Sequence, residues 1–164
     1  MITRKYLIFI GTALVLILGT VSYRQYSLSN RQAMVHEMGS YVMPFSLEDT
    51  THVFKQNPLG GVEQVLVKDP TNKDQIALIQ MHLEYEASSF RQGNFSDPMK
   101  IHGEDMPGVN DMRKNVAEIV FTYHTLPNGA EIIYSSKNSN AISAIHTWFD
   151  AQVKDHGKDA MEVH

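Results

Sequence analysis

Two segments of the chain, GGVEQVLVKDPTNKDQIALIQMHLEYE (residues 60–86) and NGAEIIYSSKNSNAISAIHTWFDAQ (residues 128–152), align with one gap of two residues. Each has a β-rich run, then turn and capping residues, then apolar residues at helical spacing. The alignment matches Gly61 with Gly129, Glu63 with Glu131, Ile76 with Ile142 and Ile79 with Ile145. The chain is therefore predicted to contain an internal duplication of one structural unit.

Each unit is predicted to be a β-hairpin followed by a helix. The predicted strands, joined in pairs by turns rich in Asn, Pro and Gly, are residues 50–55, 62–68, 116–126 and 130–136. The predicted helices, which follow asparagine-containing capping segments, are residues 72–91 and 140–155. Two such units predict an α+β fold, a two-layer sandwich in which both helices pack on one face of a four-stranded antiparallel sheet.

The N-terminal region is predicted to be an uncleaved signal-anchor. Arg4 and Lys5 precede an apolar run at residues 6–21, and no small-x-small cleavage site follows it. We expect a transmembrane helix in residues 1–22, a juxtamembrane stalk in 23–46, an extracytoplasmic domain in 47–158 and a disordered tail in 159–164. The positive N-terminal cluster is expected to stay in the cytoplasm, so that the domain faces the periplasm or cell exterior.

Composition excludes several classes of function. The formal net charge of -4 leaves no basic stripe for nucleic acid. The absence of cysteine excludes thiolate zinc sites, iron–sulfur clusters and cysteine nucleophiles, so a metal site must use His, Met or carboxylates. The sequence also lacks a Ser-His-Asp order, a phosphate-binding glycine loop and an H-E-x-x-H motif. We therefore do not expect a hydrolase, a kinase or a zinc protease.

The segment HLEYEASSFRQGNFSDPMKIHGEDMPG (residues 82–108) carries the candidate site. His82 and Glu86 are one helical turn apart, a spacing at which they can reach one metal ion or hydrogen-bond to each other. His102 and Met106 follow in a stretch whose glycines and prolines favour neither helix nor strand. Histidine with methionine is a ligand set of copper and haem, although Met106 could also be a hydrophobic plug over the sheet.

The second helix adds two histidines to this candidate site. His146 lies at the rim of its apolar stripe, and His156 is predicted to lie at its C-terminal end, facing the loop that carries His102. The predicted metal ligands are His82, Glu86, His102, Met106, His146 and His156. Copper is the first expectation, with zinc and haem as alternatives.

Four blocks of the sequence also carry a resemblance. They are VMPFSLEDTTHVF (residues 42–54), GGVEQV (60–65), residues 82–108 and AIHTWFDAQVKDHG (144–157). With these motifs the chain resembles an uncharacterised family of small bacterial membrane-anchored proteins, some of which carry an automatic label of aspartate carbamoyltransferase. The S-T-R-T-type and H-P-x-Q segments of transcarbamoylases are missing, so the resemblance implies the family and no activity.

Three functions remain open from the sequence. The first is a membrane-tethered extracytoplasmic module that holds a transition metal. The second is a non-catalytic accessory subunit of a larger membrane protein complex, with Trp148 near His146 as an exposed interface anchor. The third is an enzyme with Glu86, Asp150 or a histidine as general base, although no complete catalytic set is present.

Overall fold

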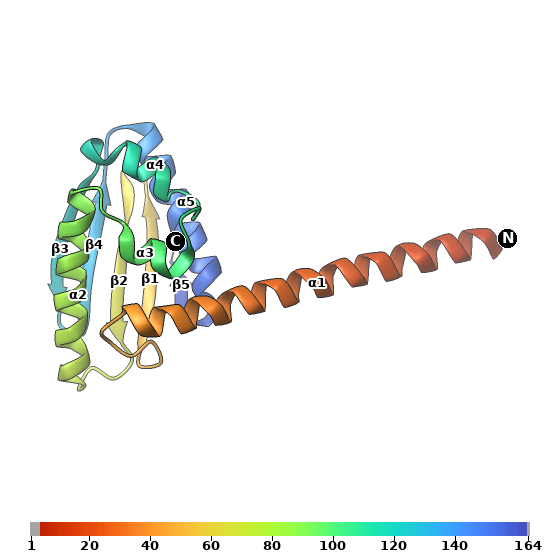
Figure 1. Cartoon of the computed structure of the whole chain (residues 1–164), viewed down its shortest axis with the longest axis horizontal. Helices are drawn as coiled ribbons and strands as arrows, with labels where there is room; N and C mark the ends of the chain where they lie inside the picture. The colour runs from red at the N-terminus through yellow and green to blue at the C-terminus, as the bar shows by residue number, and fades with distance from the viewer. Residues whose placement is uncertain (1–3, 164) are drawn as a thin grey trace.

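The computed structural model describes the backbone of residues 4–163 and the side chains of residues 16–163. The first three residues of the predicted anchor and the last residue of the predicted tail lie outside this range. Within it, helices cover one sheet, and a long N-terminal helix extends away from that domain (Figure 1).

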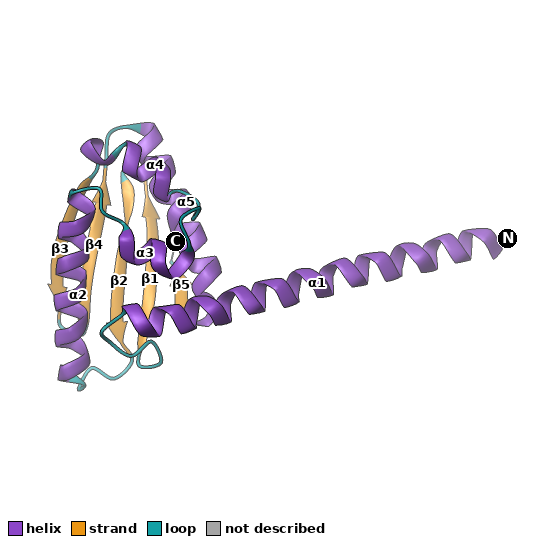
Figure 2. Cartoon of the chain, viewed as in Figure 1, coloured by secondary structure: helices purple, strands orange, loops and turns teal. Residues whose placement is uncertain are grey.

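A five-stranded mixed sheet is the centre of the fold (Figure 2). Its spatial order is β3 (Val120–Leu126), β4 (Gly129–Ser135), β2 (Gly60–Val67), β1 (Thr50–Asn57) and β5 (Ala160–Glu162). The two hairpins pair antiparallel, whereas β5 pairs parallel to β1. The predicted four-stranded antiparallel sheet is therefore wrong, because the chain contributes a fifth strand with the opposite pairing.

Strand β5 forms because the chain turns back after α5 (Ser139–His156). Gly157 has a φ of 55°, a left-handed conformation that favours glycine, and it begins a 3-10 turn (Gly157–Asp159). The turn brings Ala160 opposite His52. Residues 160–162, predicted to belong to a disordered tail, thus pair with backbone groups of β1 that would otherwise form a free sheet edge.

Helices α2 (Lys73–Arg91) and α5 both pack on the same face of the sheet, which we call the inner face. The ring of Tyr134 on β4 lies 6.3 Å from that of Phe90 on α2 and 5.3 Å from that of Phe149 on α5. The Asn72 and Asn138 side chains accept hydrogen bonds from backbone N–H groups in the first turns of these helices. Helix α2 follows the β1–β2 hairpin but packs mainly on β3 and β4, and α5 follows the β3–β4 hairpin but packs on β2 and β1. Each helix therefore covers the hairpin of the other unit.

The alignment of the two units is displaced by one residue along the strands. Gly60 and Gly129 each begin the second strand of a hairpin, so Glu63 corresponds to Ile132 rather than to Glu131. A shift of one residue moves a side chain to the opposite face of a sheet. Glu63 accordingly lies on the inner face, where it accepts a hydrogen bond from Tyr134, and Glu131 lies on the outer face beside Gln64.

The segment after α2 is more regular than its glycines and prolines indicated. It contains α3 (Ser96–His102), and α4 (Val109–Lys114) and the 3-10 turn η1 (Val116–Glu118) follow it. Pro98 is compatible with α3 because it lies in the first turn, where the backbone N–H has no helical partner. The expectation of neither helix nor strand in this segment was therefore wrong, and α3 places Asp97 and His102 on one short rigid element.

Helix α1 (Arg4–Val42) is one continuous helix of 39 residues, which includes most of the predicted stalk. Its first part projects from the domain, and its last part contacts α3 and α5 (Figure 1). Among residues 16–163, no helix has both the length and the apolar character needed to cross a membrane. The transmembrane helix predicted in residues 1–22 lies mostly outside this range.

Gly108 is a position where the fold tolerates no side chain. Its φ is 84°, and a Cβ there would lie 2.5 Å from the carbonyl oxygen of Ala144 and 2.6 Å from the backbone nitrogen of Trp148. We predict that Gly108→Ala destabilises the protein far more than Gly103→Ala. Gly103 is the matched control because its φ is 88° but no atom would lie within 4 Å of its Cβ.

Chemical denaturation of both variants measures this difference. Backbone strain alone costs about 1–3 kcal/mol in either variant. The overlap at Gly108 adds at least about 2 kcal/mol to the loss of unfolding free energy. Equal losses in the two variants would contradict the close approach of Gly108 to α5.

Candidate functional site

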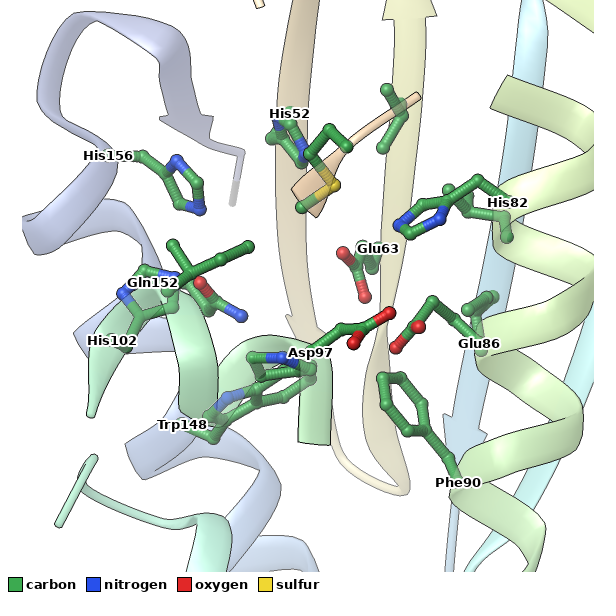
Figure 3. Close-up of a pocket in the computed structure, with 16 residues that line it drawn as sticks. His52, Glu63, His82, Glu86, Phe90, Asp97, His102, Trp148, Gln152 and His156 are labelled. Atoms are coloured by element: carbon green, nitrogen blue, oxygen red, sulfur yellow. The ribbon is translucent and has the colours of Figure 1, made fainter. Parts of the chain in front are cut away.

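A small polar cavity lies between the inner face of the sheet and helices α2, α3 and α5 (Figure 3). Its volume is about 30 Å³, enough for a metal ion or for very few water molecules. The polar residues that line it are His52, Glu63, His82, Glu86, Asp97, His102, Gln152 and His156. Burial of so many ionisable groups is costly unless they are paired or bind something, so this cavity is the candidate site.

Three imidazoles gather at one end of the cavity. The ring of His156 is stacked on that of His52 with centroids 4.9 Å apart, and it meets the ring of His102 edge-on with centroids 5.0 Å apart. The three residues come from α5, β1 and α3, and all are buried. This contact confirms the prediction that His156 faces the segment that carries His102.

His52 has a buried ring nitrogen without a partner. One ring nitrogen donates to the backbone carbonyl of Asp159, whereas Nδ1 has no hydrogen-bond partner among the residues that the structure describes. Burial and the neighbouring His82 lower the pKa of His52 to about 4, despite the opposing charge of Asp159. The ring is therefore neutral at pH 7, and Nδ1 carries a free lone pair. The side-chain oxygen of Gln152 is likewise buried without a partner and belongs to a residue that lines the same cavity.

The imidazoles of His102 and His156 lie near the C-terminal end of α5, where Asp155 is located. His102 Nδ1 donates to Asp155 Oδ2 at 3.0 Å, which leaves Nε2 available for a ligand. Burial and the neighbouring rings of His52 and His102 lower the pKa of His156 well below its usual value. Burial opposes ionisation of Asp155, but hydrogen bonds from His102 and Arg31 hold the pKa of Asp155 well below its usual range.

Three carboxyl groups occupy the other end of the cavity and point toward one another (Figure 3). Glu86 and Asp97 share a hydrogen bond, and Lys100 donates to Asp97 at 2.7 Å. Burial, then the charge of Asp97, raises the pKa of Glu86 to about 9. Burial alone would raise the pKa of Asp97, but the hydrogen bonds from Lys100 and Glu86 lower it overall. Glu86 therefore carries the shared proton at pH 7.

Glu63 is the third carboxyl group of this end. It accepts a hydrogen bond of 2.5 Å from the hydroxyl of the buried Tyr134. Burial raises the pKa of Glu63 to about 7, although the hydrogen bond from Tyr134 acts in the opposite direction. The carboxyl end thus holds protons at neutral pH that an ordinary surface carboxyl group would have lost.

Four of the six predicted ligands line the cavity, namely His82, Glu86, His102 and His156. Met106 does not, because it is packed in the hydrophobic core at 3 % exposure. His146 is also elsewhere, and its Nε2 lies 3.0 Å from the carbonyl of Asn57 and 2.8 Å from that of Gly60. Its role is to hold the turn between β1 and β2.

Two other residues proposed from the sequence are placed differently from expectation. Trp148 is 1 % exposed and packs against Phe90 and Tyr134, so it is not an exposed interface anchor. Asp150 is exposed and accepts a hydrogen bond from Gln56 at 2.6 Å, away from the cavity. Of the residues proposed as a general base, Glu86 and the cavity histidines line the cavity, but Glu86 is protonated at pH 7 and so is not a base there.

The sequence reasoning missed four polar residues of the cavity, which are His52, Glu63, Asp97 and Gln152. His52 alternates with Thr50 and Phe54 on one face of β1, a pattern that indicates an inward side chain. Gln152 follows Ile145 and Phe149 at helical spacing on α5. The sequence thus contained a signal for His52 and for Gln152. The position of Asp97, in contrast, depends on α3, a helix that was not predicted.

The side chains are not arranged as a completed metal site. Among residues 16–163, no three His, Asp or Glu side chains converge closely enough to hold a metal ion in this conformation. The chain matches no known family model, no curated protein and no solved structure. The resemblance to small membrane-anchored proteins therefore stays a prediction, and function must be argued from the cavity.

The protonated carboxyl group of Glu86 generates a prediction on stability. Its pKa of about 9 in the folded protein is above the ordinary value of 4.5, so between these pH values the folded state holds a proton that the unfolded state has lost. The contribution of Glu86 to stability therefore falls as pH rises from about 5 to 9. We predict that Glu86→Gln, whose amide can still donate to Asp97, is at least about 1 kcal/mol more stable than the wild type at pH 8.

Thermal unfolding at pH 5 and pH 8 measures this effect. The advantage of Glu86→Gln should be larger at pH 8 than at pH 5. Glu84→Gln is the control, because Glu84 is an exposed residue on the same helix. An advantage of Glu86→Gln that is independent of pH would contradict the buried proton.

Proposed function

We propose that this protein binds one divalent transition-metal ion in the cavity through the imidazoles of His52, His102 and His156. The observation that carries the proposal is the buried Nδ1 of His52, a neutral ring nitrogen whose lone pair has no partner within the described part of the chain. A buried acceptor of this kind costs free energy unless a donor or a cation satisfies it. Neutral imidazole nitrogens are the form in which histidine ligates a metal.

The spacing of the three rings supports a shared ion. Centroid distances of 4.9 and 5.0 Å leave the rings close enough for nitrogens of all three to reach one ion. The nitrogens do not converge in the present rotamers, so binding requires the rings to turn. The terminal torsion of histidine is broad, so the side chain itself allows such a turn.

The hydrogen bonds behind the rings also support this function. A histidine that ligates a metal usually donates its other ring N–H to a carboxylate or a backbone carbonyl. His102 donates to Asp155, and His52 donates to the carbonyl of Asp159. Two of the three imidazoles therefore already have the outer partners that a metal site needs.

The cavity selects among the metals considered from the sequence. A volume of about 30 Å³ is far too small for haem. Met106, the methionine predicted as a copper ligand, lies in the core, whereas Met43 lines the cavity. Three imidazoles suit Cu²⁺ and Zn²⁺, with Cu²⁺ bound more tightly. The protein is then a binding module that holds the ion, and its extracytoplasmic location stays a prediction from the sequence.

Calorimetric titration of the full chain with Cu²⁺ and with Zn²⁺ tests this proposal. We expect one ion per chain and a loss of affinity of at least about tenfold in His52→Gln and in His156→Gln. His124→Ala is the control, because His124 is exposed on the sheet face away from the cavity and its loss should leave affinity unchanged.

Electron paramagnetic resonance of the Cu²⁺ form gives a second readout. Coupling to imidazole nitrogens is expected in the wild type and should weaken in His156→Gln even if that variant is less stable. The proposal fails if neither ion binds at micromolar concentration, or if His124→Ala weakens binding as much as the cavity variants do.

A second candidate function is an accessory subunit that docks a partner protein. The observation that favours it is a group of exposed apolar side chains on the projecting part of α1, namely Leu16, Ile17, Leu18 and Val21. Exposed apolar surface of this kind is typical of interaction sites. Replacement of Leu18 and Val21 by Ser should abolish co-purification of a stoichiometric partner, and a wild-type chain that purifies alone and monodisperse would contradict this function.

A further inference from the structure

The last part of α1 contacts the carboxylate that holds His102. Arg31 donates to Asp155 Oδ2 at 2.5 Å and to the backbone carbonyl of His102 at 2.6 Å. The same Asp155 oxygen accepts from His102 Nδ1 at 3.0 Å. One carboxylate oxygen thus joins α1 to an imidazole of the cavity.

A second contact of α1 reaches the residue that holds His52. His36 Nδ1 lies 2.7 Å from Asp159 Oδ2, and the backbone carbonyl of Asp159 accepts from His52. Between these contacts Gln32 donates to the carbonyl of Lys154 at 2.9 Å, and Val35 is fully buried. Arg31 and His36 of α1 therefore bind Asp155 and Asp159, which in turn accept hydrogen bonds from the rings of His102 and His52.

We propose that docking of α1 and occupancy of the imidazole cluster are coupled, so that α1 reports the state of the cavity. This inference rests on the proposed function, since it concerns the regulation of the same site. Arg31 and His36 are positioning residues, because they act on the ion through Asp155 and Asp159. Binding requires the rings of His52 and His102 to turn. Each of these rings is hydrogen-bonded to a residue that α1 contacts, His52 to Asp159 and His102 to Asp155.

The coupling has a physical cause in the burial of Asp155. This residue is 7 % exposed, and Arg31 and His102 both donate to its Oδ2. If α1 leaves, Asp155 loses Arg31 and, among residues 16–163, keeps an ion pair with His102 alone. His102 must then serve as the sole partner of that carboxylate and is less free to turn toward an ion.

Thermodynamic linkage makes the coupling reciprocal. If docked α1 raises the affinity of the cluster for an ion, the ion must stabilise docked α1 by the same factor. The first part of α1 projects well beyond the domain, so a change in docking moves its far end (Figure 1). A small rearrangement of imidazoles is thereby converted into a displacement that a partner can detect.

Titration of α1 variants with Zn²⁺ tests one direction of the linkage. Arg31→Met should weaken Zn²⁺ binding about tenfold, within the usual range of coupling between sites. Arg31→Lys should restore part of the loss, because lysine keeps the charge without the two-pronged geometry. Arg24→Met is the matched control, since Arg24 lies on the same helix and forms no hydrogen bond or ion pair with a residue in 16–163.

Distance measurement between spin labels tests the other direction. The chain has no cysteine, so labels on Ser22→Cys of α1 and Ser88→Cys of α2, both exposed, report only the chosen positions. Addition of Zn²⁺ should narrow the distance distribution in the wild-type background. In Arg31→Met the distribution should be broader without Zn²⁺ and should narrow less on its addition.

The outcomes separate this inference from the proposed function. If neither Zn²⁺ nor Cu²⁺ binds to the wild type, the proposed function itself fails; if Cu²⁺ alone binds, it replaces Zn²⁺ in both tests of the coupling. If Zn²⁺ binds equally well to the wild type, Arg31→Met and Arg24→Met, and the label distances do not respond, the ion site stands and the coupling is refuted.

Discussion

The Asp155 carboxylate is the interaction on which the arrangement of α1, α3 and α5 depends. It lies on the last turn of α5 and binds Arg31 of α1 and His102 of α3 through one oxygen. A buried carboxylate is stable only when it has donors that offset its lost hydration, and here both donors come from other helices. The three helices are therefore positioned by the electrostatic requirement of one side chain as well as by apolar packing.

The cavity buries ionisable groups, which are unfavourable in a protein interior. Its carboxyl end keeps Glu86 protonated and shares that proton with Asp97, while its imidazole end keeps His52 and His156 neutral. Apolar side chains of similar size would avoid these desolvation costs. The aromatic core around Tyr134, Phe149 and Trp148 lies next to the cavity and supplies the packing that offsets them.

Sequence periodicity was sufficient for the hairpins and for α2 and α5, because each has a pattern of strand or helix spacing and asparagine caps. It was insufficient for β5, whose three residues have no pattern of their own and are held by pairing with β1. It was also insufficient for Met106 and His146, since the direction of a loop or rim side chain depends on tertiary contacts. His82, Glu86, His102 and His156 line one cavity, as the sequence had grouped them, because His82 and Glu86 share a turn of α2 and the end of α5 faces the segment that carries His102.

The crossing of each helix over the other hairpin has a consequence for the history of the chain. With the spacing that matches Ile76 to Ile142, the partners of His82, Glu86 and Phe90 are Trp148, Gln152 and His156, and all six line the cavity. The chamber is thus enclosed by equivalent faces of two units whose helices pack mainly on each other's hairpins. An ancestor with a single unit would therefore have required two copies to form it, as a symmetric dimer with exchanged helices.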